Sequence, residues 1–252
     1  MKKKTKYMVF HHRNKKIPDI LDLRINSIPI DRVSDFNFLG LTINENLSWK
    51  PHINKISSKI SKQIGIINKL KHILPGNVLR MLYCSLILPQ LTYSILAWGF
   101  DIGRIEKLQK RAVRVITCSK YNAHTEPIFK KLDLLKVGDI FELNLLKFYY
   151  KFVNKTLPGY FLESFNIKRQ EQVHDHDTRS GSVVAANVTR TDSAQKNVRN
   201  ILPGTISSTD AIILDKIHTH SPNGFANYIK QYQIKNYSSL CNIQNCYICS
   251  QR

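Results

Sequence analysis

The chain has 252 residues, and its 38 Lys and Arg against 18 Asp and Glu give a formal net charge of +20 at pH 7. Hydrophobic residues make up 42% of the sequence, which is enough to build a core and excludes wholesale disorder. No window of about 18 residues is uninterrupted apolar sequence, so a membrane span is not expected, and the positive charge favours a polyanionic partner, either nucleic acid or an acidic membrane surface.

The N-terminus and the cysteines indicate the compartment. Residues 1–16 hold only a short apolar patch between lysine-rich stretches, so they do not form a signal peptide. The five cysteines, three of them near the end of the chain, do not make a secreted disulfide framework. We therefore expect an intracellular protein, in the nucleus or the cytoplasm.

Short β-prone runs dominate the first 45 residues. Leu21, Leu23 and Ile25 alternate with charged residues and predict a strand, and Asn26–Ser27 predicts a turn into a second strand at 28–30. Residues 7–10 and 36–43 are further runs. Because so few strands are only marginally stable by themselves, we expect them to belong to a larger sheet.

From Ser48 onward the hydrophobic period becomes helical. Ser48 is suited to be an N-cap, with Pro51 in the first turn. An amphipathic stripe follows, made of Ile53, Ile56, Ile60, Ile64, Ile67 and Leu70. Further helices are predicted at 77–88 and 91–98, separated by Pro89. The next is predicted at 104–117, with Ile105, Leu108, Ala112 and Val115 on its apolar side. A short helix is predicted after residue 125 and a long one at 137–154.

The signal weakens after residue 166, where only 193–201 and 225–232 show brief helical patterns. The sequence therefore predicts an α+β fold that is mainly α. Residues 1–46 form a short β-sheet remnant, residues 47–166 a helical domain, and residues 167–252 a poorly ordered, partly disordered C-terminal region with a cysteine-containing tail.

Basic residues are concentrated on the predicted helices. Residues 46–100 contain no Asp or Glu. One predicted basic row comprises Lys50, Lys55, Lys59, Lys62 and Lys69, and a second comprises Arg104, Lys107, Lys110, Arg111 and Arg114, diluted only by Glu106. A solvated helix face usually mixes signs, so we interpret both rows as a surface that follows phosphates. An acidic lipid surface and a solvated face without a specific partner are the alternatives.

An ordered set of segments resembles a known family. The segments are KTKYMVF (4–10), SDFNFLGLTI (34–43), LSWKPHI (47–53), LYCSL (82–86), YSILAWG (93–99), KLQKRAVRVIT (107–117), AHTEPIF (123–129), LLKFYY (145–150), HDHDTR (174–179) and NILP (200–203). Together they resemble the C-terminal part of reverse transcriptases of non-LTR (LINE-type) retrotransposons, namely the palm edge, the thumb and the region that follows.

The resemblance implies roles for these segments. Phe38, Leu39 and Gly40 match the hairpin that grips the primer terminus, and the basic helices match the thumb that closes over the template–primer duplex. Polymerases of this kind hold two divalent cations with aspartates, but the chain has no Tyr-Ala-Asp-Asp-like turn, and Met1 falls inside an element, as in a partial or decayed copy. The aspartates of the strand region match no metal-binding position and are expected on hairpin surfaces: Asp19, Asp22, Asp31 and Asp35.

Two other clusters raise the possibility of a metal. Cys241, Cys246 and Cys249, with His218 or His220 as a remote fourth ligand, suggest zinc, but structural zinc sites need four ligands, usually in two pairs. We therefore expect a tail with reduced thiols. The HDHDTR segment at 174–179 lacks a second carboxylate–histidine pair to complete a site.

The resulting expectation is a fragment of an RNA-directed DNA polymerase that binds RNA or an RNA–DNA or DNA duplex, without membrane association. It is expected to have no polymerase activity of its own, no catalytic residues and no cofactor, with Mg²⁺ required only by a full-length polymerase. The alternatives are a domesticated helical protein–protein interaction protein with no nucleic-acid role, and a zinc-dependent nucleic-acid adaptor.

Overall fold

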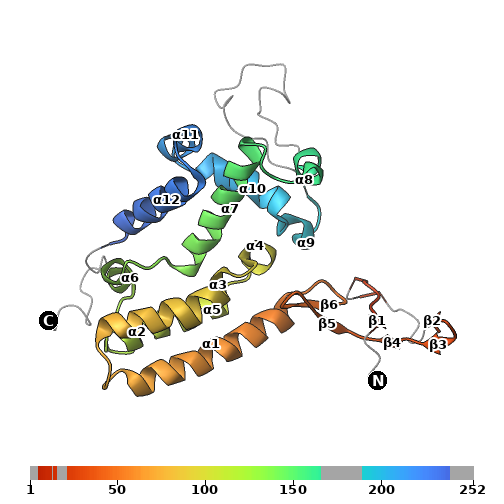
Figure 1. Cartoon of the computed structure of the whole chain (residues 1–252), viewed down its shortest axis with the longest axis horizontal. Helices are drawn as coiled ribbons and strands as arrows, with labels where there is room; N and C mark the ends of the chain where they lie inside the picture. Colours follow the sequence, from red (N-terminus) through yellow and green to blue (C-terminus); the bar gives the residue numbers. More distant parts are fainter. Residues whose placement is uncertain (1–4, 13, 16–21, 166–188, 239–252) are drawn as a thin grey trace. The chain divides into compact units, whose positions relative to one another are not determined.

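The computed structural model of the chain describes residues 5–12, 14–15, 22–165 and 189–238 (Figure 1). It divides into two compact units, Met1–Lys62 and Gln63–Arg252, with the boundary inside the long helix α1 (Lys50–Leu70). The fold is α+β and mainly helical, as the sequence predicts. In the part of the chain that the structure describes, no helix combines the length and the apolar character needed to cross a membrane.

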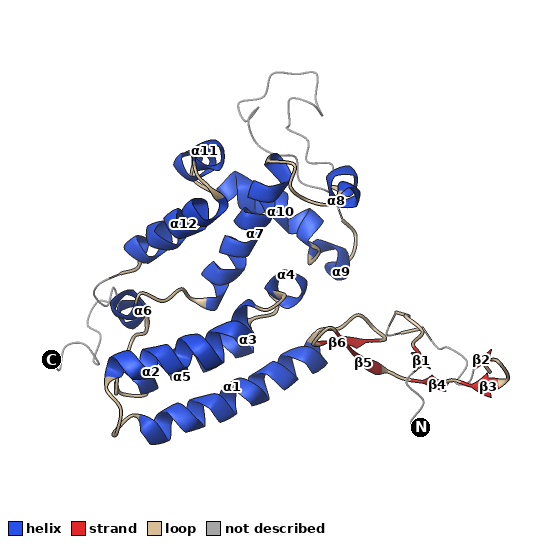
Figure 2. Ribbon diagram, viewed as in Figure 1, coloured by secondary structure: helices blue, strands red, loops and turns tan. Residues whose placement is uncertain are grey.

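The strands of the first unit form three separate two-stranded ladders (Figure 2). β1 (Lys6–Tyr7) pairs in parallel with β4 (Asp31–Arg32), and β2 (Arg24–Ile25) pairs antiparallel with β3 (Ile28–Pro29). The predicted turn at Asn26–Ser27 is confirmed, because both residues have positive φ, 48° and 64°. Two positive φ values in a two-residue loop are typical of the turn that suits the right-handed twist of a hairpin.

Residues 36–43 do not form the single run that the sequence predicts. They fold back as an antiparallel hairpin of β5 (Asp35–Phe38) and β6 (Leu41–Asn44), with Phe38 opposite Leu41. The turn is Leu39–Gly40, at φ 46° and 82°. Glycine adopts this conformation readily, whereas a bulky residue such as leucine rarely does, so the sequence signal for a turn was weak.

α1 follows the predicted pattern. Trp49 precedes the first helical residue, and its carbonyl accepts the Ile53 N–H, so the predicted N-cap Ser48 lies one residue before the cap position. Its Oγ still accepts a hydrogen bond from the Lys50 backbone N–H in the first turn, at 3.4 Å. The predicted isoleucine stripe is buried along the helix, at Ile53, Ile56, Ile60, Ile64 and Ile67.

The next helices differ from the prediction at one proline. α2 (Gly76–Leu82) continues through a π-helical turn, η1 (Tyr83–Ile87), into α3 (Leu88–Thr92), so the predicted break at Pro89 is wrong. The wide turn lets the Leu88 N–H bond the carbonyl of Tyr83, five residues back, and such turns absorb the strain of a proline in a helical run. The chain breaks instead at Ser94, with φ 48°, before α4 (Ile95–Trp98).

The rest of the second unit is built around one long helix, α7 (Val137–Val153). Two helices precede it, α5 (Gly103–Ile116) and α6 (Glu126–Leu132), and five follow it: α8 (Gly159–Ser164), α9 (Asp192–Gln195), α10 (Val198–Ser208), α11 (Ala211–Thr219) and α12 (Pro222–Asn236). The brief helical pattern at 193–201 overlaps α9 and α10, with a break at 196–197, and the pattern at 225–232 falls within α12. The sequence does not predict α11.

Helices from both sides of residue 166 lie around α7 (Figure 1). Their buried side chains share the core that α7 contributes to. Leu146 and Tyr150 of α7 form one buried cluster with Ile213, Ile217, Phe225 and Ile229 of α11 and α12. Leu145 forms another with Leu202 and Ile206 of α10. α4 approaches α7 so closely that a Cβ on Gly99, just after α4, would lie 2.4 Å from the Phe141 ring.

Candidate nucleic-acid interface

The first predicted basic row lies on the exposed side of α1. Lys55, Lys59 and Lys62 are all exposed, three to four residues apart, on the side opposite the buried isoleucines. Lys69, in the last turn, is also exposed. Lys50, the first residue of the helix, is also exposed. It is five residues before Lys55, which is not a whole number of helical turns, so Lys50 lies to the side of this row. None of the ion pairs in the described ranges involves these five lysines.

One lysine of the row also contacts the hairpin. Lys55 Nζ donates to Asn37 Oδ1 at 2.7 Å, and the same oxygen accepts from Thr42 Oγ1 at 3.0 Å. Asn37 and Thr42 are cross-strand partners, so they share one face of the β5–β6 hairpin. The ammonium of Lys55 therefore lies against the polar face of the predicted primer-grip hairpin.

The other face and the tip of the hairpin are apolar and partly open to solvent. Phe36 and Phe38 point to the face opposite Asn37, because side chains alternate along a strand, and their cross-strand partners are Ile43 and Leu41. Phe38 is 54% exposed and Leu39 in the turn is 73% exposed. The structure thus presents two of the three predicted primer-grip residues as exposed apolar side chains beside the turn glycine.

His52 attaches the hairpin to α1. It is buried, and its Nδ1 accepts a hydrogen bond from the Thr42 backbone N–H at 3.2 Å. The Trp49 ring contacts the imidazole edge-on, with centroids 5.9 Å apart. Burial, and then the charge of Lys55, lower the pKa of His52. A neutral imidazole that accepts at Nδ1 carries its proton at Nε2, so this histidine is a structural acceptor.

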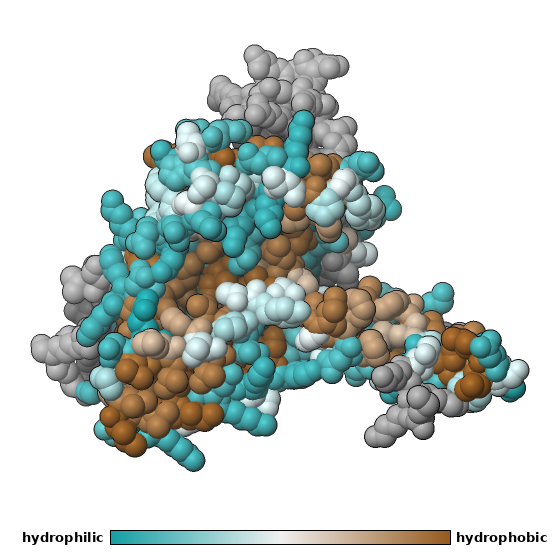
Figure 3. Space-filling model, in the orientation of Figure 1, coloured by the Kyte–Doolittle hydropathy of each residue, from teal (hydrophilic) through white to brown (hydrophobic). Residues whose placement is uncertain are grey.

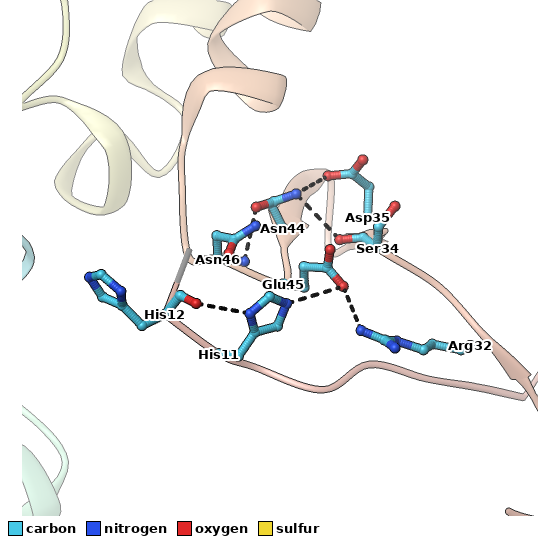
Figure 4. Close-up of polar contacts among 8 residues, drawn as sticks. All are labelled: His11, His12, Arg32, Ser34, Asp35, Asn44, Glu45 and Asn46. Carbon is cyan, nitrogen blue, oxygen red and sulfur yellow. Dashed lines mark hydrogen bonds and ion pairs between the residues drawn. The ribbon is translucent and has the colours of Figure 1, made fainter. Parts of the chain in front are cut away.

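A polar network fixes the base of the hairpin (Figure 4). The Glu45 carboxylate lies 3.3 Å from the Arg32 guanidinium and 3.8 Å from His11 Nε2, and the Glu45 carbonyl accepts from the His11 N–H at 3.1 Å. Asn44 Nδ2 donates to Asp35 Oδ1 across the two strands at 2.9 Å. These contacts join β4, β6 and the segment after β1.

The aspartates of the strand region occupy separate places. Asp22 forms an exposed ion pair with Arg24 at 2.9 Å, Asp35 bonds Asn44, and Asp31 is exposed on β4. Asp19 lies outside the described residues. Within the described ranges no three His, Cys, Asp or Glu side chains gather as a metal site would require.

The second predicted row, on α5, divides into two groups. Lys107 and Arg111 are exposed on the side of the helix opposite its buried residues, and Arg104 is exposed near the N-terminus. Lys110 forms an ion pair with Glu106 at 2.5 Å. Arg114 Nε donates to the Ala123 carbonyl at 2.8 Å, and burial lowers the pKa of its guanidinium. Arg114 therefore ties α5 to the loop before α6, a contact that the row pattern did not reveal.

The candidate zinc ligands of the tail, Cys241, Cys246 and Cys249, lie outside the described residues, as does the 174–179 segment. Of the two suggested remote ligands, His218 is exposed, and His220 lies 2.9 Å through Nδ1 from Thr219 Oγ1. The described cysteines, Cys84 and Cys118, are free thiols.

The sequence reading missed the residues that position the hairpin. Asn37, Thr42 and His52 were not singled out, because their roles depend on contacts made between β5, β6 and α1. The only local signal was the closeness of a strand, a glycine and a capped helix start in residues 38–53.

Comparison with known proteins gives one partial relationship. No protein-family model and no solved structure matches the chain. Over 129 residues the chain is 24% identical to the probable RNA-directed DNA polymerase from transposon BS of Drosophila melanogaster. The matched region covers 48% of this chain and 14% of that protein, so the chain corresponds to a small part of its length. The chain thus contains a region related to a transposon RNA-directed DNA polymerase.

Proposed function

We propose that this chain is the palm-edge and thumb portion of a non-LTR-type reverse transcriptase and that it binds template–primer duplex, RNA–DNA or DNA. The lysine row of α1 carries the proposal. Within the second unit, Lys107 and Arg111 of α5 are proposed as a separate group of phosphate contacts. The relationship to a transposon RNA-directed DNA polymerase supports the same assignment at a coarser level.

The spacing of the row suits a phosphate backbone. Lys55 and Lys62 are seven residues apart, which is about 10 Å along a helix. One strand of a duplex carries a phosphate about every 3.4 Å, so the three exposed lysines from 55 to 62 cover roughly three phosphates. No carboxylate occurs in residues 46–100 to neutralise them.

The hairpin is proposed to contact the end of the primer strand. Phe38 and Leu39 offer apolar surface to a sugar or a base, and base stacking on aromatic rings is largely independent of sequence. Gly40 allows the tight turn that exposes both side chains. Lys55 holds the other face of the hairpin at Asn37, so the proposed backbone contact and the proposed primer contact adjoin.

The chain is proposed to bind without polymerising. Metal-dependent nucleotidyl transfer needs carboxylates that hold two cations together. Asp22 and Asp35 instead contact neighbouring side chains on hairpin surfaces, Arg24 and Asn44. Purified protein is expected to extend no primer on an RNA template with Mg²⁺ or Mn²⁺. Any template-dependent extension would overturn this part of the proposal.

Salt dependence tests the binding surface. The double variant Lys59→Gln/Lys62→Gln is expected to bind a fluorescent RNA–DNA duplex more weakly, and its slope of log affinity against log salt should be smaller by about 2, since each lost phosphate contact removes roughly 0.9. Anisotropy titrations at several salt concentrations measure both effects. The matched control is Lys147→Gln/Lys151→Gln, which removes the same charge from exposed positions on α7.

Two results would contradict the assignment. An affinity of the wild-type chain that stayed constant with salt would exclude phosphate contacts, because these release counterions. Equal losses in the α1 variant and the α7 control would show that the total charge matters and the row does not.

A protein-interaction role has one observation in its favour. The strand region exposes large apolar side chains, among them Ile25 and Ile28, and hydrophobic surface gathers over β2 and β3 (Figure 3). Clustered exposed apolar residues often mark a protein interface. This role predicts that duplex affinity is weak and insensitive to the α1 variant, so the same titrations separate the two functions.

A further inference from the structure

A cleft in the second unit, with a volume of about 600 Å³, has no part in the proposed duplex surface. It lies among four segments: the turn that follows α1, the start of α2, the C-terminal end of α5 and the C-terminal end of α6. Ligand pockets for small molecules typically enclose about 300–1,000 Å³. The cleft is therefore large enough for a molecule the size of a nucleotide.

The charge of the cleft is positive. Lys71, Arg80 and Lys131 line it, against a single carboxylate, Asp133. That carboxylate is already paired, with Lys230 Nζ at 2.6 Å and the Arg80 guanidinium at 3.6 Å. Lys71 and Lys131 take part in none of the ion pairs of the described chain, so their charges face the cleft without a compensating acid.

The floor of the cleft is apolar. Leu79 and Ile116 line it and are themselves 1% and 3% exposed, so they lie at its bottom, and Leu74 and Leu132 add half-buried apolar surface. An inorganic anion alone would leave this surface uncovered, and an uncharged apolar molecule would leave the two lysines uncompensated. The lining therefore suits a ligand with an anionic end and an apolar or aromatic body.

Arg80 supplies a planar surface beside this floor. Its Nε donates to the Leu132 carbonyl at 2.6 Å, and its guanidinium also faces Asp133, so the group is held at two points. A fixed guanidinium plane stacks on aromatic rings, including nucleobases.

We propose that this cleft binds a nucleoside monophosphate or a terminal nucleotide, with the phosphate at Lys71 and Lys131 and the base between Arg80 and the floor formed by Leu79 and Ile116. This site goes beyond the proposed duplex binding and does not depend on it, because no residue of the α1 row lines the cleft.

Gly76 gives a sharp test. It lines the cleft at the first residue of α2, and a Cβ added there would meet no atom within 4 Å. Gly76→Glu places a carboxylate at the cleft and is compatible with the helix, because acidic residues are favourable in a first turn. The matched control is Gly103→Glu, which puts the same residue at the open first position of α5.

Calorimetry with adenosine 5′-monophosphate, adenosine and inorganic phosphate measures the binding. We expect the monophosphate to bind at least about tenfold more tightly than either fragment. Gly76→Glu should weaken its binding by at least about tenfold, because the added carboxylate repels the phosphate across the cleft. Gly103→Glu should bind as the wild type does. Equal affinity for the monophosphate and for inorganic phosphate, or equal losses in the two glutamate variants, would overturn the proposal.

Cys118 locates the ligand independently of any variant. Its exposed thiol lines the cleft, so the monophosphate is expected to slow its alkylation severalfold, as read by peptide mass spectrometry, while the alkylation rate of Cys84 stays unchanged. No change at Cys118 under saturating ligand would also overturn the proposal. The variant Lys59→Gln/Lys62→Gln should retain monophosphate binding, which separates failure of this site from failure of the duplex surface.

Discussion

Gln109 is a fully buried amide on a face of α5 whose other buried residues are apolar. Its Nε2 donates to Tyr83 Oη at 2.8 Å and to the Leu135 carbonyl at 2.9 Å, and its Oε1 accepts from the Val137 N–H at 2.8 Å. Burial raises the pKa of Tyr83, so its hydroxyl stays protonated. One amide thus joins α5, η1 and the start of α7, with both of its donor positions and its oxygen bonded.

Replacing this amide should destabilise the second unit. Gln109→Leu keeps the volume but leaves the Leu135 carbonyl and the Val137 N–H buried without a partner, at about 1–3 kcal/mol each. We expect the free energy of unfolding, measured with urea, to fall by about 3 kcal/mol. The exposed position Gln231 on α12 is the control, where Gln231→Leu should change stability by less than about 0.5 kcal/mol. A loss below about 1 kcal/mol for Gln109→Leu would show that the network is not a main support.

The sequence predicts buried residues well where local spacing decides burial and poorly where distant partners do. The isoleucines of α1 follow from a 3.6-residue period that any solvated helix against a core must obey. On α5 the sequence favoured Leu108 and Val115, whereas the structure buries Gln109 and Val113 and leaves those two half-buried. Gln109 is tolerated in the core only because residues 83, 135 and 137 complete its hydrogen bonds.

At the scale of elements, the β5–β6 hairpin depends on His52. Because burial lowers its folded-state pKa below the ordinary value of 6.5, the unfolded imidazole takes up a proton first as the pH falls. The Thr42–His52 bond therefore contributes fully above about pH 6.5 and is progressively lost below it.

Hydrogen exchange at the Thr42 amide checks this dependence. Relative to intrinsic rates, its protection should fall by up to about tenfold between about pH 7.5 and 5.5, one unit below the ordinary pKa. In His52→Gln, which keeps an acceptor that does not titrate, protection should stay level. The Glu45 amide, which donates to the Ser34 carbonyl at 2.9 Å, is the internal control. A parallel fall at Thr42 and Glu45 would point to general loosening of the hairpin.

Two elements adopt local conformations that their residue types disfavour. The resemblance implied a hairpin at 38–40, but local residue preferences did not, because its turn uses Leu39 at φ 46° and a turn signal such as Asn-Gly is absent. The helix from α2 to α3 passes Pro89 through a π turn, where a break is the ordinary expectation. In both places the residue types alone favour a different local conformation.

At the scale of the whole molecule, the sequence located the charge but not the cleft. The basic rows are visible because each belongs to one helix. The cleft cations come from three separate segments, at Lys71, Arg80 and Lys131, and no spacing rule connects them. Their convergence depends on how α2, α5 and α6 pack.

Packing around α7 also bears on the domain boundary that the sequence places near residue 167. Tyr237, after α12, donates to the Asp139 carboxylate on α7, and Lys130 Nζ donates to the Tyr237 carbonyl at 2.7 Å. With the cores that α7 shares with α10, α11 and α12, these contacts predict that the regions on either side of the boundary unfold together. Independent domains would instead give two transitions.

The fluorescence of Trp98 reports on the region before residue 167, and a substitution at Ile229 perturbs the region after it. In a Trp49→Phe background, Trp98 in α4 is the remaining tryptophan, and both Trp98 and Ile229 are fully buried. Ile229→Ala removes buried methyl groups from α12, which costs about 2–5 kcal/mol in a core. We expect urea midpoints from Trp98 fluorescence and from far-UV circular dichroism to shift together, and the exposed control Ile212→Ala to shift neither. A cavity in one cooperative core must destabilise every helix that contributes to that core. If the Trp98 midpoint stayed fixed while the dichroism signal was lost at lower urea, the helices after residue 188 would therefore form a separate domain.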